Sequence, residues 1–280
     1  MSLMTEIEWL GMEFLVSNET PVRLFVFFGV LAFMALLEAV LPKKKRAMPR
    51  IQRWLTNMSL VVINSVVLRL VAPVLAVGVA SWALTNNIGL LNWLRLPVVA
   101  EFLVAFLLLD MLIYFQHIIF HKLPVLWRFH KVHHADRDID VTTGVRFHPI
   151  EIIISMLYKL ACVALIGPSV VLVIVFEIAL NASAMFNHSN LSLTKPLDRF
   201  LRIFVVTPDF HRVHHSVVRA ETDSNYGFFL SVWDRLFGTY IDQPQETHQG
   251  MVIGLYEYQT EQPAKLFWSL VVPFKKLKTV

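Results

Sequence analysis

The sequence predicts an all-α, polytopic integral membrane protein with four to five spans or hairpin segments and a histidine-rich helical cap on the cytoplasmic side. Of its 280 residues, 56% are hydrophobic and only 16% are charged, so the bilayer is the expected solvent of most of the chain. Apolar runs of about 20 residues or more, long enough to cross hydrocarbon, recur along it. Ten of the 11 histidines lie between residues 117 and 215, and eight of these ten fall in clusters with helical spacing.

The N-terminal part of the chain, residues 1–96, predicts membrane anchor helices. Its apolar runs cover about 22–41 and 54–84, and each is long enough to span a bilayer. Arg69 and Pro73 interrupt the second run, so part of it is expected at the membrane interface. The first run follows an acidic N-terminus and has no small-residue cleavage site behind it, which favours a retained anchor over a signal peptide.

The basic residues that follow the first run predict the orientation of the chain. They are Lys43, Lys44, Lys45, Arg46, Arg50 and Arg53. Because cytoplasmic loops carry an excess of Lys and Arg, this loop is expected in the cytoplasm, with a solvated or headgroup-binding surface. A third run at 97–116 then returns the chain to the cytoplasmic side. The formal net charge of +4 is too small to indicate nucleic acid as a partner.

The apolar run at 150–187 predicts a helical hairpin. Gly167 and Pro168 stand near its centre, where they end one helix and allow another to begin. Each half is about 28 Å long at about 1.5 Å per residue, close to the thickness of the hydrocarbon. The hairpin would return His188 to the side of His148, so that all histidine clusters share one membrane face.

The histidine clusters predict a metal site. One copy of H-x-x-x-H and two copies of H-x-x-H-H place imidazoles on one face of a helix, where several can bind one ion. A single histidine in an apolar chain is usually a packed core residue, but repeated clusters of one geometry argue against that interpretation and against a solvated His-rich tract. Imidazole suits Zn, Cu, Fe and Ni alike. Nine or ten histidines are too many for one ion and fit two ions with four or five ligands each.

Asp110 is a carboxylate inside the third apolar run. Asp110 shares a helical stripe with Tyr114 and His117, so it could orient a ligand histidine by accepting its second ring N–H. It could equally pair with a buried base such as Arg69, because an intramembrane carboxylate is costly unless it is functional or paired. The sequence leaves both possibilities open.

Six segments together resemble the fatty acid hydroxylase/sterol desaturase superfamily. They are HIIFH at 117–121, WRFHKVHH at 127–134, FHPIE at 147–151, NHSN at 187–190, HRVHHS at 211–216, and NYG with WDRLFGT within 225–239. The resemblance covers about residues 100–240 and implies an integral membrane di-iron oxygenase that hydroxylates or desaturates lipid C–H bonds. One departure is that many members have arginine after the first histidine of the first segment, where this chain has Ile118.

The resemblance also implies the ligands of two iron ions, with O2 as co-substrate. These ligands are His117, His121, His130, His133, His134, His188, His211, His214 and His215, with His148 of the FHPIE segment as a tenth. Four polar residues in or near the motifs are candidates to orient the ligand rings or, equally, to act as helix caps and turn residues: Asp110, Asn187, Asp209 and Asn225. No catalytic residue is expected beyond the metal site.

Together these observations predict an oxidoreductase that oxidises a fatty acyl chain, a sterol or a related lipid at a non-haem di-iron centre. Removing hydrogen from an alkyl chain needs an oxidant that redox-active iron can form and zinc cannot. No haem, flavin or ferredoxin motif is visible, so a separate electron donor resembling ferredoxin or cytochrome b5 is expected. The predicted domains are an anchor (1–96), a catalytic domain (97–245) and a C-terminal interfacial tail (246–280).

Two alternatives stay open. Within the superfamily, the protein could be an ether-lipid or sterol-methyl monooxygenase. Outside it, the histidines could bind zinc or b-type haem in a non-enzymatic membrane protein, such as a transporter or an electron carrier. A transporter should distribute ionisable residues through the bilayer, whereas here they gather at one end.

Overall fold

The chain folds into helices throughout the part that the structure describes. The computed structural model describes residues 11–72 and 75–275. Within these ranges it has no strand, only isolated β-bridges such as that between Pro42 and Leu191. Five helical segments there are long and apolar enough to cross a membrane. The predicted all-α class with four to five spans is therefore confirmed.

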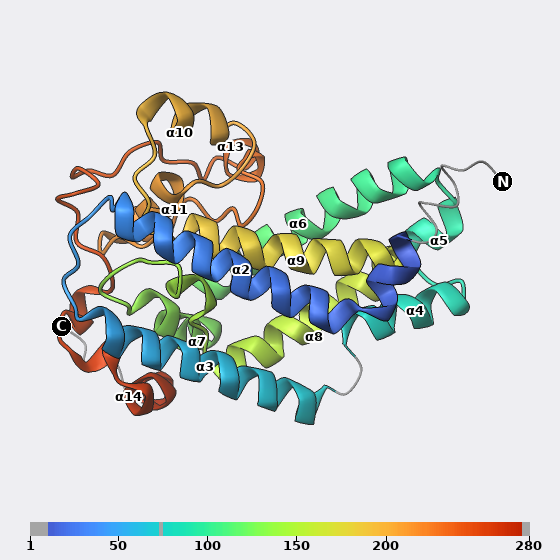
Figure 1. Ribbon diagram of the computed structural model, residues 1–280, viewed down its shortest axis with the longest axis horizontal. Helices are drawn as coiled ribbons and strands as arrows, with labels where there is room; N and C mark the ends of the chain where they lie inside the picture. Colours follow the sequence, from blue (N-terminus) through green and yellow to red (C-terminus); the bar gives the residue numbers. More distant parts are fainter. Residues whose placement is uncertain (1–10, 73–74, 276–280) are drawn as a thin grey trace.

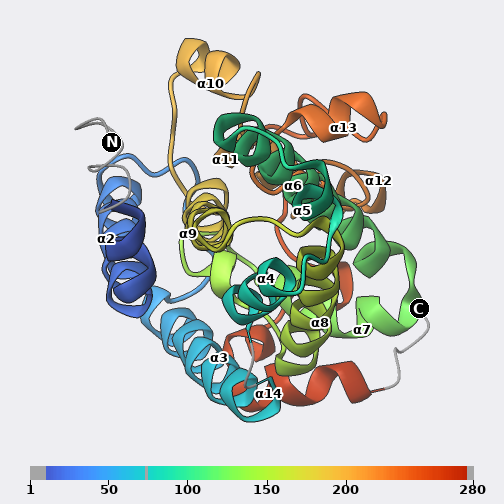
Figure 2. The same cartoon turned by 90° about the vertical axis from the view of Figure 1, so that its right-hand side faces the viewer.

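Long helices form an elongated bundle (Figure 1). They are α2 (Glu19–Val40), α3 (Arg50–Val71), α6 (Val98–Lys122), α8 (Pro149–Ile166) and α9 (Val170–Asn187). Helix α9 packs against α2 and α6, and α8 packs against α3 and α6. Seen along the bundle, α2 and α3 lie on one side and α6 on the other (Figure 2).

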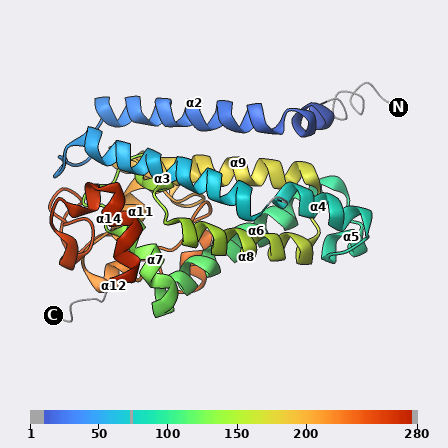
Figure 3. The same ribbon diagram turned by 90° about the horizontal axis from the view of Figure 1, so that it is seen from below.

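The second apolar run does not form one continuous helix. Helix α3 ends at Val71 and α4 (Ala76–Thr85) begins after a break, while Pro73 itself lies outside the described residues. Helix α4 and the short α5 (Leu90–Leu94) lie at the end of the bundle away from the cap (Figure 3). The interruption that the sequence predicted is present as a break between helices.

Helices α8 and α9 form the predicted hairpin. Gly167 ends α8 with a φ of +66°, in the left-handed region that glycine adopts without strain. A Cβ at this position would lie 2.7 Å from the carbonyl oxygen of Ile88, because the turn packs closely on the loop before α5. The hairpin therefore turns at the far end of the bundle, and His148 and His188 both lie at the opposite end.

A cap of short helices closes that opposite end (Figure 1). It contains α7 (Pro124–His134), η1 (Thr143–Val145), α10 (Lys195–Leu201), α11 (Pro208–His214), α12 (Arg219–Thr222), α13 (Val232–Leu236), η2 (Tyr256–Tyr258), η3 (Gln262–Ala264), α14 (Leu266–Val271) and η4 (Val272–Phe274).

The apolar residues divide between a core and an outer face. Leu109, Val163 and Phe176 belong to a buried cluster between α4, α6, α8 and α9. The outer faces expose large apolar side chains such as Phe25 (80%) and Leu70 (78%). Such an exterior suits hydrocarbon as the solvent, because lipid tails are as apolar as these side chains.

A buried ion-pair network joins α3 to the cap. The guanidinium of Arg53 donates to Asp136 at 2.6 and 2.7 Å and to Asp140 at 2.6 Å, and the Arg53 side chain is fully buried. The expectation of a solvated or headgroup-binding surface was therefore wrong for Arg53. Because removing one member of a buried pair leaves an uncompensated charge, this network fixes the loop before α8 on α3.

Candidate metal centre

Nine histidines form two buried groups at the cap end of the bundle. Within each group, one ligand atom from every residue lies within 4.8 Å of the others. Group 1 consists of His117, His121, His130, His134 and His214, and group 2 consists of His133, His188, His211 and His215. The division into sets of five and four matches the two ions expected from the number of histidines.

Each H-x-x-H-H motif serves both groups. On α7, His130 and His134 lie one turn apart and face group 1. His133 is rotated by about 100° from His134 and faces group 2. The second motif lies on α11 and its C-terminal cap, and its first and third histidines again share a group. Here the groups are exchanged, because His211 and His215 face group 2 and His214 faces group 1. Helix α6 completes group 1, and His188, at the end of α9, completes group 2.

Hydrogen bonds fix the tautomer of several rings. The Nδ1 of His117 lies 2.8 Å from the carbonyl oxygen of Tyr226, and the Nδ1 of His214 lies 2.7 Å from that of Ser224. A carbonyl oxygen only accepts, so each Nδ1 carries the proton and each Nε2 presents a lone pair. The Nδ1 atoms of His133 and His188 bond to backbone carbonyls in the same way.

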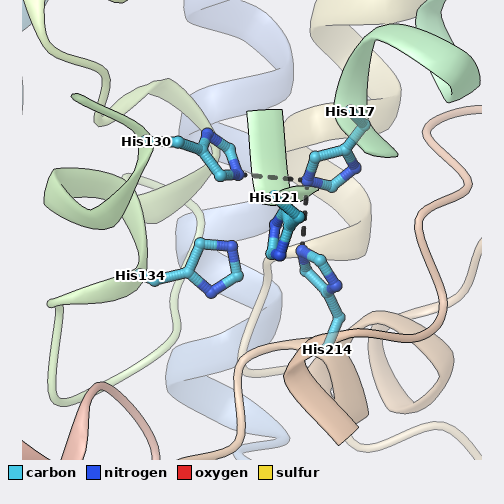
Figure 4. A group of neighbouring side chains, drawn as sticks. All are labelled: His117, His121, His130, His134 and His214. Atoms are coloured by element: carbon cyan, nitrogen blue, oxygen red, sulfur yellow. Dashed lines mark hydrogen bonds between the residues drawn. The ribbon is translucent and has the colours of Figure 1, made fainter. Parts of the chain in front are cut away.

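In group 1, the Nε2 atoms of His117, His130 and His214 point toward one another (Figure 4). The Nε2 atom of His117 lies 3.1 Å from that of His214, and in group 2 the Nε2 atoms of His133 and His188 are 3.0 Å apart. Neither nitrogen of such a pair has a proton to donate, so the neutral rings repel each other at this distance. Metal–nitrogen bonds of about 2.1 Å would place neighbouring ligand nitrogens about 3.0–3.4 Å apart. The spacing therefore fits a shared cation.

Further ring nitrogens of the two groups make no hydrogen bond within the described part of the chain. Both ring nitrogens of His121, His134 and His215 are buried without a hydrogen bond. Leaving a buried polar group unsatisfied costs about 1–3 kcal/mol. A bound metal ion would satisfy one nitrogen of each ring, so the donor set fits the implied metal.

Burial keeps four of the ligand rings neutral. It lowers the pKa of His188 to about 3, and it lowers the pKa of His133, His214 and His215 well below the ordinary value. These four rings therefore stay neutral at physiological pH, and the neutral ring is the form that binds metal.

Two carboxylates also contact ligand rings, and sequence reasoning missed both. Glu151 Oε1 accepts from His130 Nδ1 at 2.6 Å, and Asp223 Oδ1 lies 3.4 Å from His121 Nδ1. Glu151 is part of the FHPIE segment, three residues after His148. An acid so close to a histidine motif could have been predicted from the sequence as a partner of a ligand ring. Asp223 contacts α6 from a distant part of the chain, and no local pattern marks it.

The four polar residues predicted to orient ligands have other partners. Asp110 accepts from Trp233 Nε1 at 2.8 Å and from the backbone of Leu230. The remaining three bond as follows: Asn187 to the Phe228 carbonyl, Asp209 to Lys43 and Arg212, and Asn225 to the backbone of Phe210 and Ile241. They hold the cap together around the ligands.

His148 lies outside both groups. Its Nδ1 accepts from the backbone N–H of Ile150 at 3.1 Å, which caps α8, and its Nε2 donates to the carbonyl of Leu270 at 3.2 Å. Both ring nitrogens are therefore engaged, and we leave His148 out of the ligand set.

Residues 102–239, which contain both groups, match the fatty acid hydroxylase family. The predicted resemblance to the fatty acid hydroxylase superfamily is confirmed. Alkylglycerol monooxygenase from Danio rerio is 31% identical over 156 residues, or 55% of this chain and 34% of that protein. Ornithine lipid hydroxylase OlsE from Rhizobium tropici is 26% identical over 229 residues, or 79% of this chain and 67% of the relative.

A third relative has a different named activity. Very-long-chain aldehyde decarbonylase GL1-11 from Oryza sativa subsp. japonica is 29% identical over 184 residues, or 63% of this chain and 68% of the relative. The chain spans about a third of the length of the alkylglycerol monooxygenases that it matches. No solved structure gives a significant match. The names monooxygenase and hydroxylase agree with the oxidoreductase class predicted from the sequence.

Proposed function

We propose that this protein is an O2-dependent oxidoreductase that hydroxylates or desaturates a C–H bond of a fatty acyl chain, a sterol or a related lipid. The observation that carries the proposal is the pair of all-histidine groups at one end of an apolar helical bundle. Relatives named as lipid hydroxylases and monooxygenases support the same class of substrate.

Groups 1 and 2 would each hold one iron ion through Nε2 or Nδ1 atoms of the histidines. Bound iron would supply the redox chemistry that activates O2. The chain itself keeps the Nε2 atoms available, because the carbonyls of Tyr226 and Ser224 retain the Nδ1 protons of His117 and His214. We place the site on the cytoplasmic side, with electrons from a separate donor protein resembling ferredoxin or cytochrome b5.

Aromatic side chains enclose the ligand rings. The ring of Phe147 stacks on His133 with centroids 4.7 Å apart, and those of Trp127 and Tyr226 lie 4.9 and 5.1 Å from His121. These contacts restrict rotation of the imidazoles and exclude water from the site, which protects a reactive oxidant from side reactions.

Oxidation of an ether lipid is a second candidate within the same chemistry. Similarity to alkylglycerol monooxygenases favours it, although the matched part is only 34% of the Danio rerio protein. In that case the oxygen would enter at the carbon next to an ether oxygen, and the same residues would hold the metal.

Comparative lipidomics of cells with and without the protein tests the proposal. We expect one lipid class to gain an oxygen or lose two hydrogens, and a His133→Ala variant to abolish the change. An ether-lipid substrate would appear instead as loss of alkylglycerols. The lipids are compared among cells with the intact protein, cells with the variant and cells without the protein. Identical lipids in all three would contradict the proposed function, provided that the intact protein carries iron.

A further inference from the structure

The cap carries an apolar surface beside α6 that no described part of the chain covers. It lies on α10, the residues after it and α13. Its large side chains are between 42% and 65% exposed: Leu197, Phe200, Ile203, Phe204, Val232, Leu236 and Phe237. We call this surface the α10–α13 patch. Large apolar patches are rare on surfaces that face water and usually mark contact with a protein or a membrane.

The two helices of the patch belong to one connected unit. The backbone N–H of Val206 donates to the Phe229 carbonyl at 2.9 Å, and that of Ser231 donates to the Phe204 carbonyl at 3.2 Å. Helices α10 and α13 project from the same side of the cap in both views (Figures 1 and 2). Their exposed side chains can therefore engage one surface together.

The patch reaches the depth of the bilayer on α6. Phe237 stacks on Tyr114 with centroids 5.6 Å apart and lies 4.9 Å from the ring of Phe115. At about 1.5 Å per residue, Phe115 is about 25 Å along α6 from Val98, within the roughly 30 Å of a hydrocarbon core. Helix α13 therefore adjoins a membrane-spanning segment at its boundary with the headgroups.

Charge also distinguishes a membrane from a protein partner. Lys195 and Arg199 are exposed on α10, next to its apolar side chains. Interfacial helices combine an apolar face with basic residues, because the apolar side chains enter the boundary between headgroups and acyl chains while the cations meet anionic headgroups. This combination, continuous with the lipid-facing α6, favours lipid over a second copy of the chain.

We propose that the α10–α13 patch is a membrane-contact surface that rests in the headgroup and acyl boundary of the leaflet on the metal-site side. It attaches the cap to the bilayer beside α6, in addition to the spanning helices. The proposal does not depend on the metal or on the reaction.

Fluorescent labels on the full-length protein in nanodiscs test this contact. In a Cys162→Ala background, single cysteines replace Phe200, Leu236 or the exposed Gln249, which serves as a polar control on the cap. Each carries an environment-sensitive dye. The nanodiscs contain phosphatidylcholine with phosphatidylglycerol, and quenching is measured with a spin-labelled lipid and with aqueous iodide.

We expect the labels of Phe200→Cys and Leu236→Cys to emit at shorter wavelength and to lose most of their emission to the spin-labelled lipid. The Gln249→Cys label should be quenched by iodide instead. Strong iodide quenching at positions 200 and 236 would overturn the proposal. So would protection from both quenchers together with crosslinking between copies, because that result would make the patch a self-association surface.

Discussion

The backbone orients most of the fixed ligand rings. His188 donates from Nδ1 to the carbonyl of Ala184 at 2.7 Å, and His133 donates to the carbonyl of Arg146 at 3.2 Å. Glu151 is the exception, since it orients His130 with a carboxylate. Ring orientation therefore follows largely from the path of the backbone. Glu151 and, through a longer contact, Asp223 are the side chains at which a substitution can disturb it.

Removing one ligand from each group should cost metal and activity. His133 belongs to group 2 and His214 to group 1, so His133→Ala and His214→Ala should each abolish lipid oxidation and reduce bound metal from two ions toward one per chain. Elemental analysis of purified protein measures the metal. One ion per chain in the unsubstituted protein would contradict the two-metal site.

His248→Ala is the control for both variants. We expect it to keep most of the metal and activity, because His248 is buried but lies outside both groups, with Nε2 3.8 Å from Asp209 Oδ2. Equal losses in all three variants would mean that the grouping of the histidines is wrong.

Glu151→Gln should weaken metal binding at group 1 alone. The amide can no longer provide a charged acceptor for the Nδ1–H of His130, and loss of such a partner typically costs about 10- to 100-fold in metal affinity. Competition with a chelator measures the affinity, and Glu257→Gln, at an exposed position, is the matched control. Unchanged affinity at group 1 would show that the carboxylate does not support the ligand.

The ligand histidines could be predicted because their spacing is a local property of helices, whereas their partners could not. The carbonyl that orients His117 belongs to Tyr226, 109 residues away, and every residue type has a carbonyl. Asp110 was a reasonable candidate on α6, but its oxygens meet Trp233, which is 123 residues distant. Such contacts depend on the packing of the cap, which no short motif specifies.

Arg146 connects three parts of the molecule. Its buried guanidinium donates to the Val132 carbonyl on α7 at 2.9 Å and to Asn57 Oδ1 on α3 at 2.7 Å. It also donates to the Pro263 carbonyl at 2.7 Å and to Ser269 Oγ at 2.9 Å in the C-terminal segment. That segment therefore packs against the elements that carry the metal ligands.

Arg146→Lys should lower stability by about 1–3 kcal/mol, because a lysine cannot make all four hydrogen bonds. We also expect faster proteolysis of the C-terminal segment and weaker metal binding at group 2, since the Arg146 carbonyl orients His133. Thermal unfolding and limited proteolysis measure these effects. Arg137→Lys, at a half-buried position, is the control and should change stability little. Equal losses of stability in the two variants would show that Arg146 has no special role.

Gly167→Ala should destabilise the α8–α9 hairpin. The left-handed backbone alone costs a non-glycine residue about 1–2 kcal/mol, and the new Cβ would lie 2.7 Å from the Ile88 carbonyl oxygen. Gly29→Ala in α2 is the matched control, because a Cβ there meets nothing within 4 Å and alanine favours helix. Gly167→Ala should lower the unfolding temperature in detergent, and Gly29→Ala should leave it unchanged. A reversed order would contradict the packing at the turn.

The bundle is apolar on the outside and carries the two histidine groups at one end. The sequence could predict this arrangement because the length of each apolar run and the Gly167–Pro168 break indicate how many segments are long enough to cross a membrane. It could not predict the break between α3 and α4 in detail or the burial of Arg53, since both depend on neighbouring helices.

We expect all the ligands to lie on the cytoplasmic side of the membrane. No ligand can join a metal site across about 30 Å of hydrocarbon, and the basic run after α2 favours the cytoplasm for the cap. In a Cys162→Ala background, cysteines replace Arg128 and Lys195 on the cap and Asn86 in the loop after α4, all at exposed positions. An impermeant maleimide added to intact cells should label only position 86, and permeabilisation should add 128 and 195. Labelling of positions 128 and 195 from outside would show that the orientation is the reverse of the predicted one, without contradicting the metal site. Labelling of these two positions from opposite sides of the membrane would contradict the fold.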